Sequence, residues 1–287
     1  DINNVNKELI HADINDVLIV YTPAVPANHS ELNYFKDKGY TIKKRSQVLG
    51  LITESTRTIA VAGTHGKTTT SSLVAHILKV AKLDPTAFLG GITQNYNTNL
   101  LLSKNHEATE LVVVEADEYD RSFLTLHPEI AVITSVDADH LDIYGDKKYV
   151  EESYNLFSKQ VKSSLVLKHS ITDKISPHKH TITYSLNDSA ADYSAQNIRM
   201  QQGEYTYDIV TPGATFKNIT LGLNGLHNIE NSIAATAIAC LMNVSEEHIR
   251  EALKTFKGAK RRFDYQIKTN DLVFIDDYAH HPEELKA

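Results

Sequence analysis

Hydrophobic positions along the chain alternate between short continuous runs and a helical spacing, a pattern typical of α/β proteins. Residues 58–62 form an apolar, strand-like run, and residues 63–66 form a glycine-containing loop. Apolar side chains then recur at helical spacing within residues 67–82, at Leu73, Val74, Ile77 and Leu78. This stretch therefore predicts a strand, a loop and a helix in that order.

Further apolar runs extend the strand into a sheet. Residues 111–114 and 130–136 are continuously hydrophobic, as strands buried on both faces of a parallel sheet are. Between about 164 and 222 the pattern changes to short alternating segments, including 205–210 and 216–221. The sequence predicts an α/β fold with a parallel sheet and a smaller antiparallel portion.

The same patterns predict elements on both sides of this region. Helices are expected at residues 31–38, 46–54, 228–242 and 245–256. Residues 17–21 are typical of a short strand, residues 258–262 of a basic hinge, and residues 272–275 of the first strand of a further domain.

Composition agrees with an ordinary packed protein. A length of 287 residues suggests about two domains. A hydrophobic content of 41% and a charged content of 23% exclude collagen-like, low-complexity and wholly disordered chains. With 29 basic against 36 acidic residues, the net charge of −7 argues against general attraction to nucleic acid or anionic membranes.

Cysteine usage and hydropathy bear on location. The single Cys240 cannot form an internal disulfide, and its alanine-rich surroundings predict a buried small hydrophobe. No apolar run approaches the roughly 18 residues of a membrane span, and no signal peptide opens the chain. We expect a soluble cytoplasmic protein without membrane insertion and without a nucleic-acid partner.

Residues 63–69 have the composition of a phosphate-binding loop between a strand and a helix. They are Gly63, Thr64, His65, Gly66, Lys67, Thr68 and Thr69. Backbone N–H groups could hold phosphate oxygens, the Lys67 amine could reach the β and γ phosphates, and the Thr68 hydroxyl could bind Mg²⁺. The general motif has a glycine at position 61, where this chain has valine, which disfavours an ordinary Walker GTPase or ATPase. The alternative is a plain glycine turn with a solvated Lys67.

Acidic clusters follow the next two predicted strands, at 115–120 and 137–142. Parallel sheets bind ligands beyond the carboxyl ends of their strands, so both clusters should lie beside the loop. Glu115 and Thr68 suit Mg²⁺, which prefers hard oxygen ligands. His140 is either a ligand or a core histidine, and the other acids are expected to be solvated or to cap helices. Zinc is disfavoured, because the chain has no His-Glu-x-x-His motif and no cysteine pair.

Taken together, the motifs resemble those of the Mur ligases, the ATP-dependent amide-forming enzymes of peptidoglycan precursor synthesis. The family loop has the form Gly-Thr-x-Gly-Lys-Thr, which accounts for the displaced glycine. Five further motifs match in order, at residues 115–120, 139–142, 225–231, 258–263 and 276–282. The resemblance implies a central ATP-binding domain at 57–257, a partial UDP-sugar-binding domain at 1–56, and a hinge with the start of an amino-acid-binding domain at 258–287, the outer two being Rossmann-like.

The resemblance also implies roles for individual residues. ATP is the implied nucleotide, with Mg²⁺ as its metal. Lys67 and Arg262 would contact the γ-phosphate, Thr68 and Glu115 would bind one Mg²⁺, and His140 would bind a second. The adenosine end would meet His227, Asn228 and Asn231. The residues that would face the phosphates and the incoming amino acid are Asp277, Tyr278, His280 and His281.

Within the family, the variants Gly-Thr-His-Gly-Lys-Thr-Thr-Thr and Glu-Ala-Asp-Glu are most similar to the branch that joins L-alanine to UDP-N-acetylmuramate. Other branches often carry a carbamylated lysine near the position of Ser153 and Tyr154, where this chain has none. The implied reaction proceeds through an acyl phosphate. Two alternatives remain open: a ligase that attaches a recycled tripeptide to the same nucleotide, and an inactive nucleotide-binding fragment, because both ends look cut.

Overall fold

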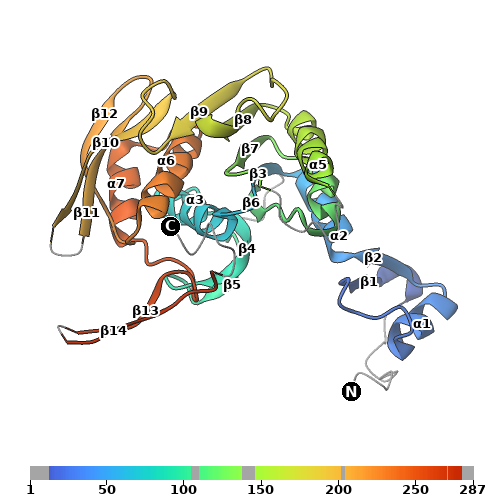
Figure 1. Cartoon of the computed structure of the whole chain (residues 1–287). Coiled ribbons are helices and arrows are strands. Elements are labelled where there is room, and N and C mark those ends of the chain that lie inside the picture. Colours follow the sequence, from blue (N-terminus) through green and yellow to red (C-terminus); the bar gives the residue numbers. More distant parts are fainter. Residues whose placement is uncertain (1–12, 105–109, 138–145, 202–203, 270, 280–287) are drawn as a thin grey trace.

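Strands from most of the chain pair into one large sheet, which carries helices on both faces (Figure 1). The computed structural model describes residues 13–104, 110–137, 146–201, 204–269 and 271–279. Within these ranges the sheet has ten strands, in the order β12-β11-β10-β9-β8-β7-β3-β6-β4-β5. Their bounds are β3 (Arg57–Ala62), β4 (Thr86–Thr93), β5 (Thr98–Leu101), β6 (Leu111–Glu115), β7 (Ile130–Ile133), β8 (Ser164–Lys168), β9 (Thr181–Ser185), β10 (Tyr193–Gln201), β11 (Glu204–Val210) and β12 (Thr215–Leu221).

The centre of the sheet is parallel and both of its ends are antiparallel. Parallel pairing extends without a break from β4 through β6, β3, β7, β8 and β9 to β10. Antiparallel pairing joins β10, β11 and β12 at one end, and β4 and β5 at the other. The predicted α/β architecture is confirmed, but the expected change near residue 164 was placed too early. β8 is almost entirely buried, as the parallel strands before it are, and the direction reverses only between β10 and β11.

Alternate residues of the central strands face two separate hydrophobic cores. In β3, Ile59 and Val61 pack with α3 (Lys67–Val80), α6 (Leu226–Leu241) and α7 (Glu246–Thr255). Ala60 and Ala62 point to the opposite face, which α2 (Arg45–Ser55) and α5 (Lys147–Gln160) cover (Figure 1). Because strand side chains alternate between faces, a continuously apolar strand serves both cores.

Smaller elements flank this domain. β1 (Leu18–Tyr21) pairs in parallel with β2 (Thr41–Lys44), beside α1 (Ser30–Asp37). β13 (Asp264–Lys268) and β14 (Val273–Asp276) form an antiparallel hairpin. Short 3₁₀ helices are η2 (Ile14–Asp16), η3 (Tyr119–Thr125) and η4 (His169–Ile171). The predicted helices and flanking strands are confirmed to within a few residues, whereas the mostly polar β2 and β13 and the short β5 were not predicted.

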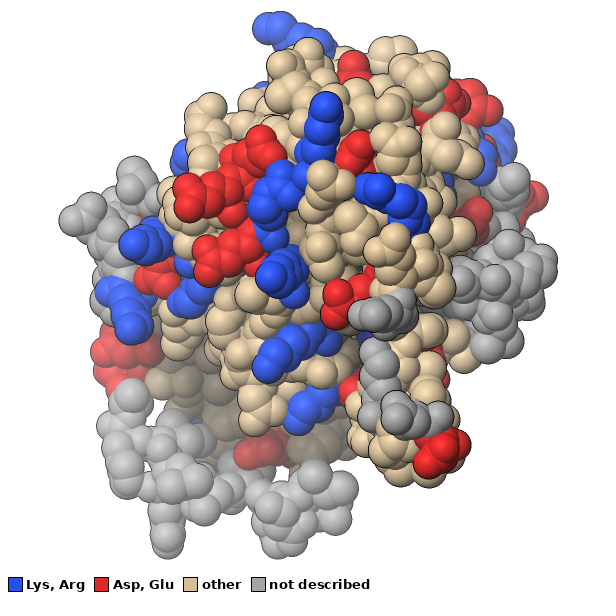
Figure 2. Space-filling view, turned by 90° about the vertical axis from the view of Figure 1, so that its left-hand side faces the viewer, with Lys and Arg blue, Asp and Glu red and all other residues tan. Residues whose placement is uncertain are grey.

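Three properties of the structure bear on the expectations from the sequence. Cys240 is half-buried rather than fully buried, and burial raises the pKa of its thiol. In the part of the chain that the structure describes, no helix has the length and apolar character needed to cross a membrane. The face shown in Figure 2 carries Lys and Arg side chains interspersed with Asp and Glu, instead of one continuous basic surface.

Candidate functional site

Two glycines shape the loop between β3 and α3. Gly63 has φ +135° and Gly66 has φ +82°, backbone conformations that side chains disfavour. A Cβ at Gly66 would lie 2.8 Å from Oδ1 of Asn231. Gly66 stands immediately before α3, so the loop ends at a helix N-terminus, where backbone N–H groups are free to bind an anion.

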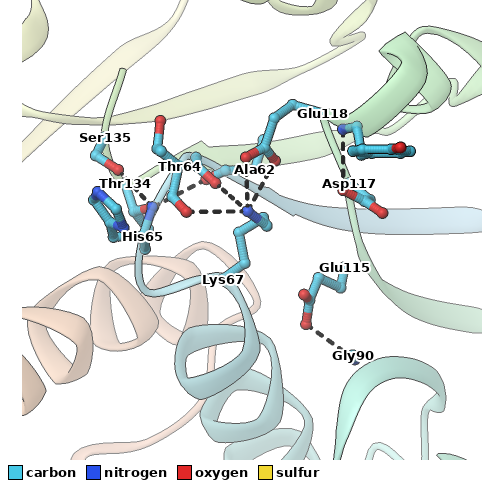
Figure 3. A network of polar contacts seen from close by, with 12 residues as sticks. Ala62, Thr64, His65, Lys67, Gly90, Glu115, Asp117, Glu118, Thr134 and Ser135 are labelled. Carbon is cyan, nitrogen blue, oxygen red and sulfur yellow. Dashed lines mark hydrogen bonds and ion pairs between the residues drawn. The ribbon is translucent and has the colours of Figure 1, made fainter. Parts of the chain in front are cut away.

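Lys67 occupies the centre of a polar network within this loop (Figure 3). Its Nζ donates to the carbonyl oxygens of Gly63 and Thr64, at 2.7 and 3.2 Å. The same amine contacts both carboxylate oxygens of Glu118, at 2.8 and 3.0 Å. The Lys67 side chain is only 14% exposed, so the amine is directed inward at a fixed position and is not simply solvated.

Glu118 corrects the expectation that the remaining acids are solvated or cap helices. It is 2% exposed, and burial raises the pKa of its carboxyl while the Lys67 charge opposes that rise. Its position in the Glu-Ala-Asp-Glu motif was visible in the sequence. Nothing in the local spacing indicated that it meets a lysine 51 residues earlier.

Thr68 and Glu115 lie side by side at the mouth of the loop. The Thr68 hydroxyl donates to Oε1 of Glu115 at 3.1 Å. The Gly90 N–H donates to Oε2 of Glu115 at 2.9 Å (Figure 3). Burial raises the pKa of Glu115, against the opposing charge of Lys67. A hydroxyl and a buried carboxylate in contact fit Mg²⁺, which needs few protein ligands because it retains several waters.

Gly90 belongs to β4, which pairs with β6. A Cβ at this position would overlap the Glu115 carboxylate. The glycine therefore allows the backbone of β4 to approach and orient that carboxylate.

The residues after β7 support the loop from behind. The Ser135 hydroxyl accepts a hydrogen bond from the His65 N–H at 2.8 Å, and Thr134 Oγ1 donates to the Ala62 carbonyl at 3.2 Å. The Asp137 N–H donates to the Thr64 hydroxyl at 3.0 Å. Sequence reasoning did not single out Thr134 or Ser135, although two small hydroxyl residues directly after a buried strand are a usable signal.

The predicted residues of α6 lie on the opposite side of the loop. Asn228 is buried and donates from Nδ2 to the Asn224 carbonyl at 2.6 Å. Asn231 approaches Gly66, as described above, and His227 contacts the ring of Phe263 with centroids 6.3 Å apart. The i, i+1 and i+4 spacing thus brings the three α6 residues to one cavity.

Residues that follow α7 in the chain also line the site. The Arg262 guanidinium lies over the Tyr278 ring, 5.4 Å from its centroid. The Phe263 N–H donates to Oδ2 of Asp277 at 3.0 Å. Arg262 and Asp277 line the cavity, and Tyr278 is linked to it through Arg262. The predicted sites at His140, His280 and His281 lie outside the described residues.

These groups surround a cavity of about 760 Å³, within the usual size range of small-molecule sites. Its loop side comprises Thr64, His65, Gly66, Lys67, Thr68 and Thr69. Lys168, Tyr184 and Glu230 also line it. Glu230 lies within the 225–231 motif but had no predicted role, whereas Lys168 of β8 and Tyr184 of β9 lie outside every motif.

A parallel α/β sheet, a lysine-bearing glycine loop and an adjoining cavity define this chain as a phosphate-loop α/β protein. Residues 61–239 match the family model of the Mur ligase middle domain. The chain belongs to the Mur ligase family.

Individual relatives support the same grouping. The chain is 47% identical over 273 residues to UDP-N-acetylmuramate–L-alanine ligase of Cytophaga hutchinsonii, covering 94% of this chain and 59% of the relative. It is 46% identical to the ligase of that name from Flavobacterium johnsoniae, covering 99% and 62%. The chain thus spans about three fifths of the length of these curated relatives.

Solved structures agree with the fold. The crystal structure of UDP-N-acetylmuramate-alanine ligase from Thermotoga maritima superposes with a TM-score of 0.80 at 28% identity, covering 94% of this chain and 62% of that one. UDP-N-acetylmuramate:L-alanyl-gamma-D-glutamyl-meso-diaminopimelate ligase from Neisseria meningitides superposes with a TM-score of 0.73 at 25% identity, covering 84% and 80%.

Proposed function

We propose that these residues form the nucleotide-binding part of an ATP-dependent ligase that joins L-alanine to UDP-N-acetylmuramate in peptidoglycan precursor synthesis. The observation that carries the proposal is 46–47% identity, over 94% or more of this chain, to ligases of that name. The inward-facing Lys67 beside a nucleotide-sized cavity supplies the chemistry that such a reaction requires.

The reaction must activate a carboxylate, because a carboxylate oxygen is a poor leaving group. Transfer of the ATP γ-phosphoryl group to the carboxylate of the muramate gives an acyl phosphate and releases ADP. The neutral amine of L-alanine then attacks the acyl carbon, the C–O bond to phosphate breaks, and inorganic phosphate and the amine proton leave. Both reactants of the first step are anions, so catalysis depends on positioning and charge neutralisation.

Lys67 and Arg262 would provide that neutralisation from two sides of the cavity. Lys67 would exchange its contact with Glu118 for phosphate oxygens, while the loop N–H groups hold the phosphates at the start of α3. Thr68 and Glu115 would hold Mg²⁺, which when bound neutralises charge on the phosphates. His140 would hold a second ion, and His227, Asn228 and Asn231 would meet the adenosine.

The C-terminal motif would complete the site. Asp277 and Tyr278, with His280 and His281, would face the phosphates and the amino acid. A cytoplasmic location agrees with the nucleotide substrates. The division into segments 1–56, 57–257 and 258–287 belongs to the same proposal.

The test measures ADP release by the complete protein that contains these residues, with UDP-N-acetylmuramate and ATP present. We expect release when L-alanine is added, and none when L-alanyl-γ-D-glutamyl-meso-diaminopimelate replaces it. Release with the tripeptide alone would assign the recycling activity instead, and no release with either would assign an inactive module.

Lys67→Ala provides the variant for this assay. We expect it to abolish ADP release while leaving the fold intact, although less stable, because Lys67 belongs to neither hydrophobic core. Lys79→Ala on the same helix, where the amine pairs with Asp84 away from the cavity, should retain activity. Full phosphate release by Lys67→Ala would contradict the proposed role of the loop.

A further inference from the structure

Sheet order sets the direction in which a nucleotide would lie in the cavity. β3, which leads into the phosphate loop, has β6 on one side and β7 on the other. Glu115 ends β6 and Gly90 lies in β4, so the metal-binding and γ-phosphate end belongs on that side. The base must therefore extend the other way, over the carboxyl ends of β7, β8 and β9.

Strand spacing places this base end. Neighbouring strands are about 4.8 Å apart, so β8 and β9 lie roughly 10 and 14 Å from β3. These are the distances at which a nucleoside would extend from phosphates held on the loop. The cavity residues contributed by these strands are Lys168, the last residue of β8, and Tyr184 of β9.

A charged pair stands at this end of the cavity. Lys168 Nζ donates to Oε2 of Glu230 at 2.9 Å, with the two side chains 30% and 19% exposed. Glu230 projects from the first turns of α6, next to Asn231. Tyr184 is buried, and its burial with the nearby Glu230 charge raises the pKa of the phenol well above its usual value, so it remains a neutral aromatic wall.

The chemistry of Glu230 discriminates between purines. An ionised carboxylate only accepts hydrogen bonds. Within the described ranges Glu230 accepts one, from Lys168 to Oε2, and Glu230 lines the cavity, so Oε1 would be the oxygen that meets the base. The 6-amino group of adenine can donate to such an oxygen, whereas the 6-oxo group of guanine or hypoxanthine presents a second acceptor that the carboxylate repels.

We propose that Glu230, held in position by Lys168, is a specificity-determining residue that selects a 6-aminopurine nucleotide. This inference rests on the proposed function, because it requires a purine nucleotide in the cavity. Lys168 acts as the positioning residue: it fixes one carboxylate oxygen and balances the negative charge, so that the other oxygen faces the base.

The test compares the affinities of ADP and IDP by calorimetry. These nucleotides differ in that the 6-amino group of adenine is replaced by the 6-oxo group, with N1 protonated, in hypoxanthine. We expect the unmodified protein to bind ADP about tenfold or more tighter than IDP, the range for a hydrogen bond to a charged group. In Glu230→Gln the side-chain amide can donate to the 6-oxo oxygen, so the preference should fall to about threefold or less.

Glu247→Gln is the matched control, because Glu247 is exposed at the start of α7 and does not line the cavity. It should keep the full ADP preference. Both affinities are measured on each variant, so a general loss of folded protein cancels in their ratio.

Equal affinities of the unmodified protein for ADP and IDP, or an unchanged preference in Glu230→Gln, would overturn this inference and leave the proposed function standing. An equal loss of both affinities in Glu230→Gln would also overturn it, because that result indicates a purely structural role. Failure of the unmodified protein to bind any nucleotide would overturn the proposed function and the inference with it.

Discussion

At the residue scale, the charged amine of Lys67 is held in position by groups of the protein itself. Its amine is held by two loop carbonyls and by Glu118, a carboxylate that is itself almost fully buried. A buried lysine without a counterion would be costly. The pair therefore stabilises the loop in the absence of nucleotide, and Glu118 competes with phosphate for the same amine.

Replacing Glu118 with glutamine separates these two effects. We expect Glu118→Gln to lower the free energy of unfolding without nucleotide by on the order of 2 kcal/mol, because a largely buried cation loses its counterion. Triphosphate binding would restore a negative partner, so ATP should stabilise the variant more than it stabilises the unmodified protein. Thermal unfolding with and without ATP measures both quantities.

Asp120→Asn is the neighbouring control, since Asp120 pairs with Lys44 at the surface and does not contact Lys67 in any hydrogen bond or ion pair that the structure describes. It should leave the ATP-induced stabilisation nearly unchanged. A smaller ATP-induced stabilisation in Glu118→Gln than in the unmodified protein would show that Glu118 assists phosphate binding instead of competing with it.

At the scale of elements, His76 joins three segments that meet beside the sheet. It lies on α3, and its ring nitrogens contact the Tyr96 hydroxyl at 2.7 Å and the Thr255 hydroxyl at 3.1 Å. Tyr96 belongs to the turn between β4 and β5, and Thr255 ends α7. His76 is 5% exposed, and burial lowers the pKa of its ring to about 4.

This shift predicts a pH dependence of stability. The pKa of the His76 ring is lowered from 6.5 to about 4 in the folded protein. The stability that this group contributes is therefore complete above pH 6.5. It is lost as the pH falls toward 4, because the unfolded chain takes up the proton at a higher pH than the folded protein does. Between pH 7.5 and 5 the unmodified protein should lose on the order of 2 kcal/mol of unfolding free energy through this group.

His76→Gln removes the titrating ring while keeping a hydrogen-bonding side chain. Its unfolding free energy, measured in urea at both pH values, should fall by about 2 kcal/mol less than that of the unmodified protein. The same decrease in both proteins would rule out His76 as the source of the pH dependence.

At the scale of the whole molecule, the segment after α7 is attached to the central sheet before it reaches the hairpin. Asn95 donates to the Thr255 carbonyl and accepts from the Lys257 N–H, each at 2.8 Å. Lys260 donates from its backbone to Ile92 and from Nζ to Asn97, also at 2.8 Å each. Residues 257–260 are thus hydrogen-bonded to the end of β4 and to the turn that follows it, and the hinge at 258–262 stays a prediction.

Asn95→Ala tests this attachment. It removes two hydrogen bonds that hold the chain around Lys257, so limited trypsin cleavage after Lys257 should become on the order of tenfold faster. Asn99→Ala, an exposed position in the adjoining β5, should cleave at the original rate. Mass spectrometry of the fragments identifies the site, and equal rates for both variants would show that the attachment lies elsewhere.

Features that depend on interactions between residues close together in the chain could be predicted from the sequence, and features that depend on distant residues could not. Strand β3, the glycine loop and helix α3 were predictable because apolar runs, glycines and helical periodicity act over a few neighbouring residues. The same holds for the three α6 residues, which share one helical face. The hydrophobic pattern placed the end of the parallel region too early, near residue 164. Such a pattern cannot locate this end, because the direction of a strand depends on which strands it pairs with.

The sequence alone thus determined the α/β class, the loop and the order of the motifs. The tertiary structure alone decided that Glu118 meets Lys67, that Gly90 orients Glu115, and that Lys168 meets Glu230 across 62 residues. The physical reason is that such contacts depend on strand order in the sheet and on how α6 packs against it, and no local spacing in the chain encodes either.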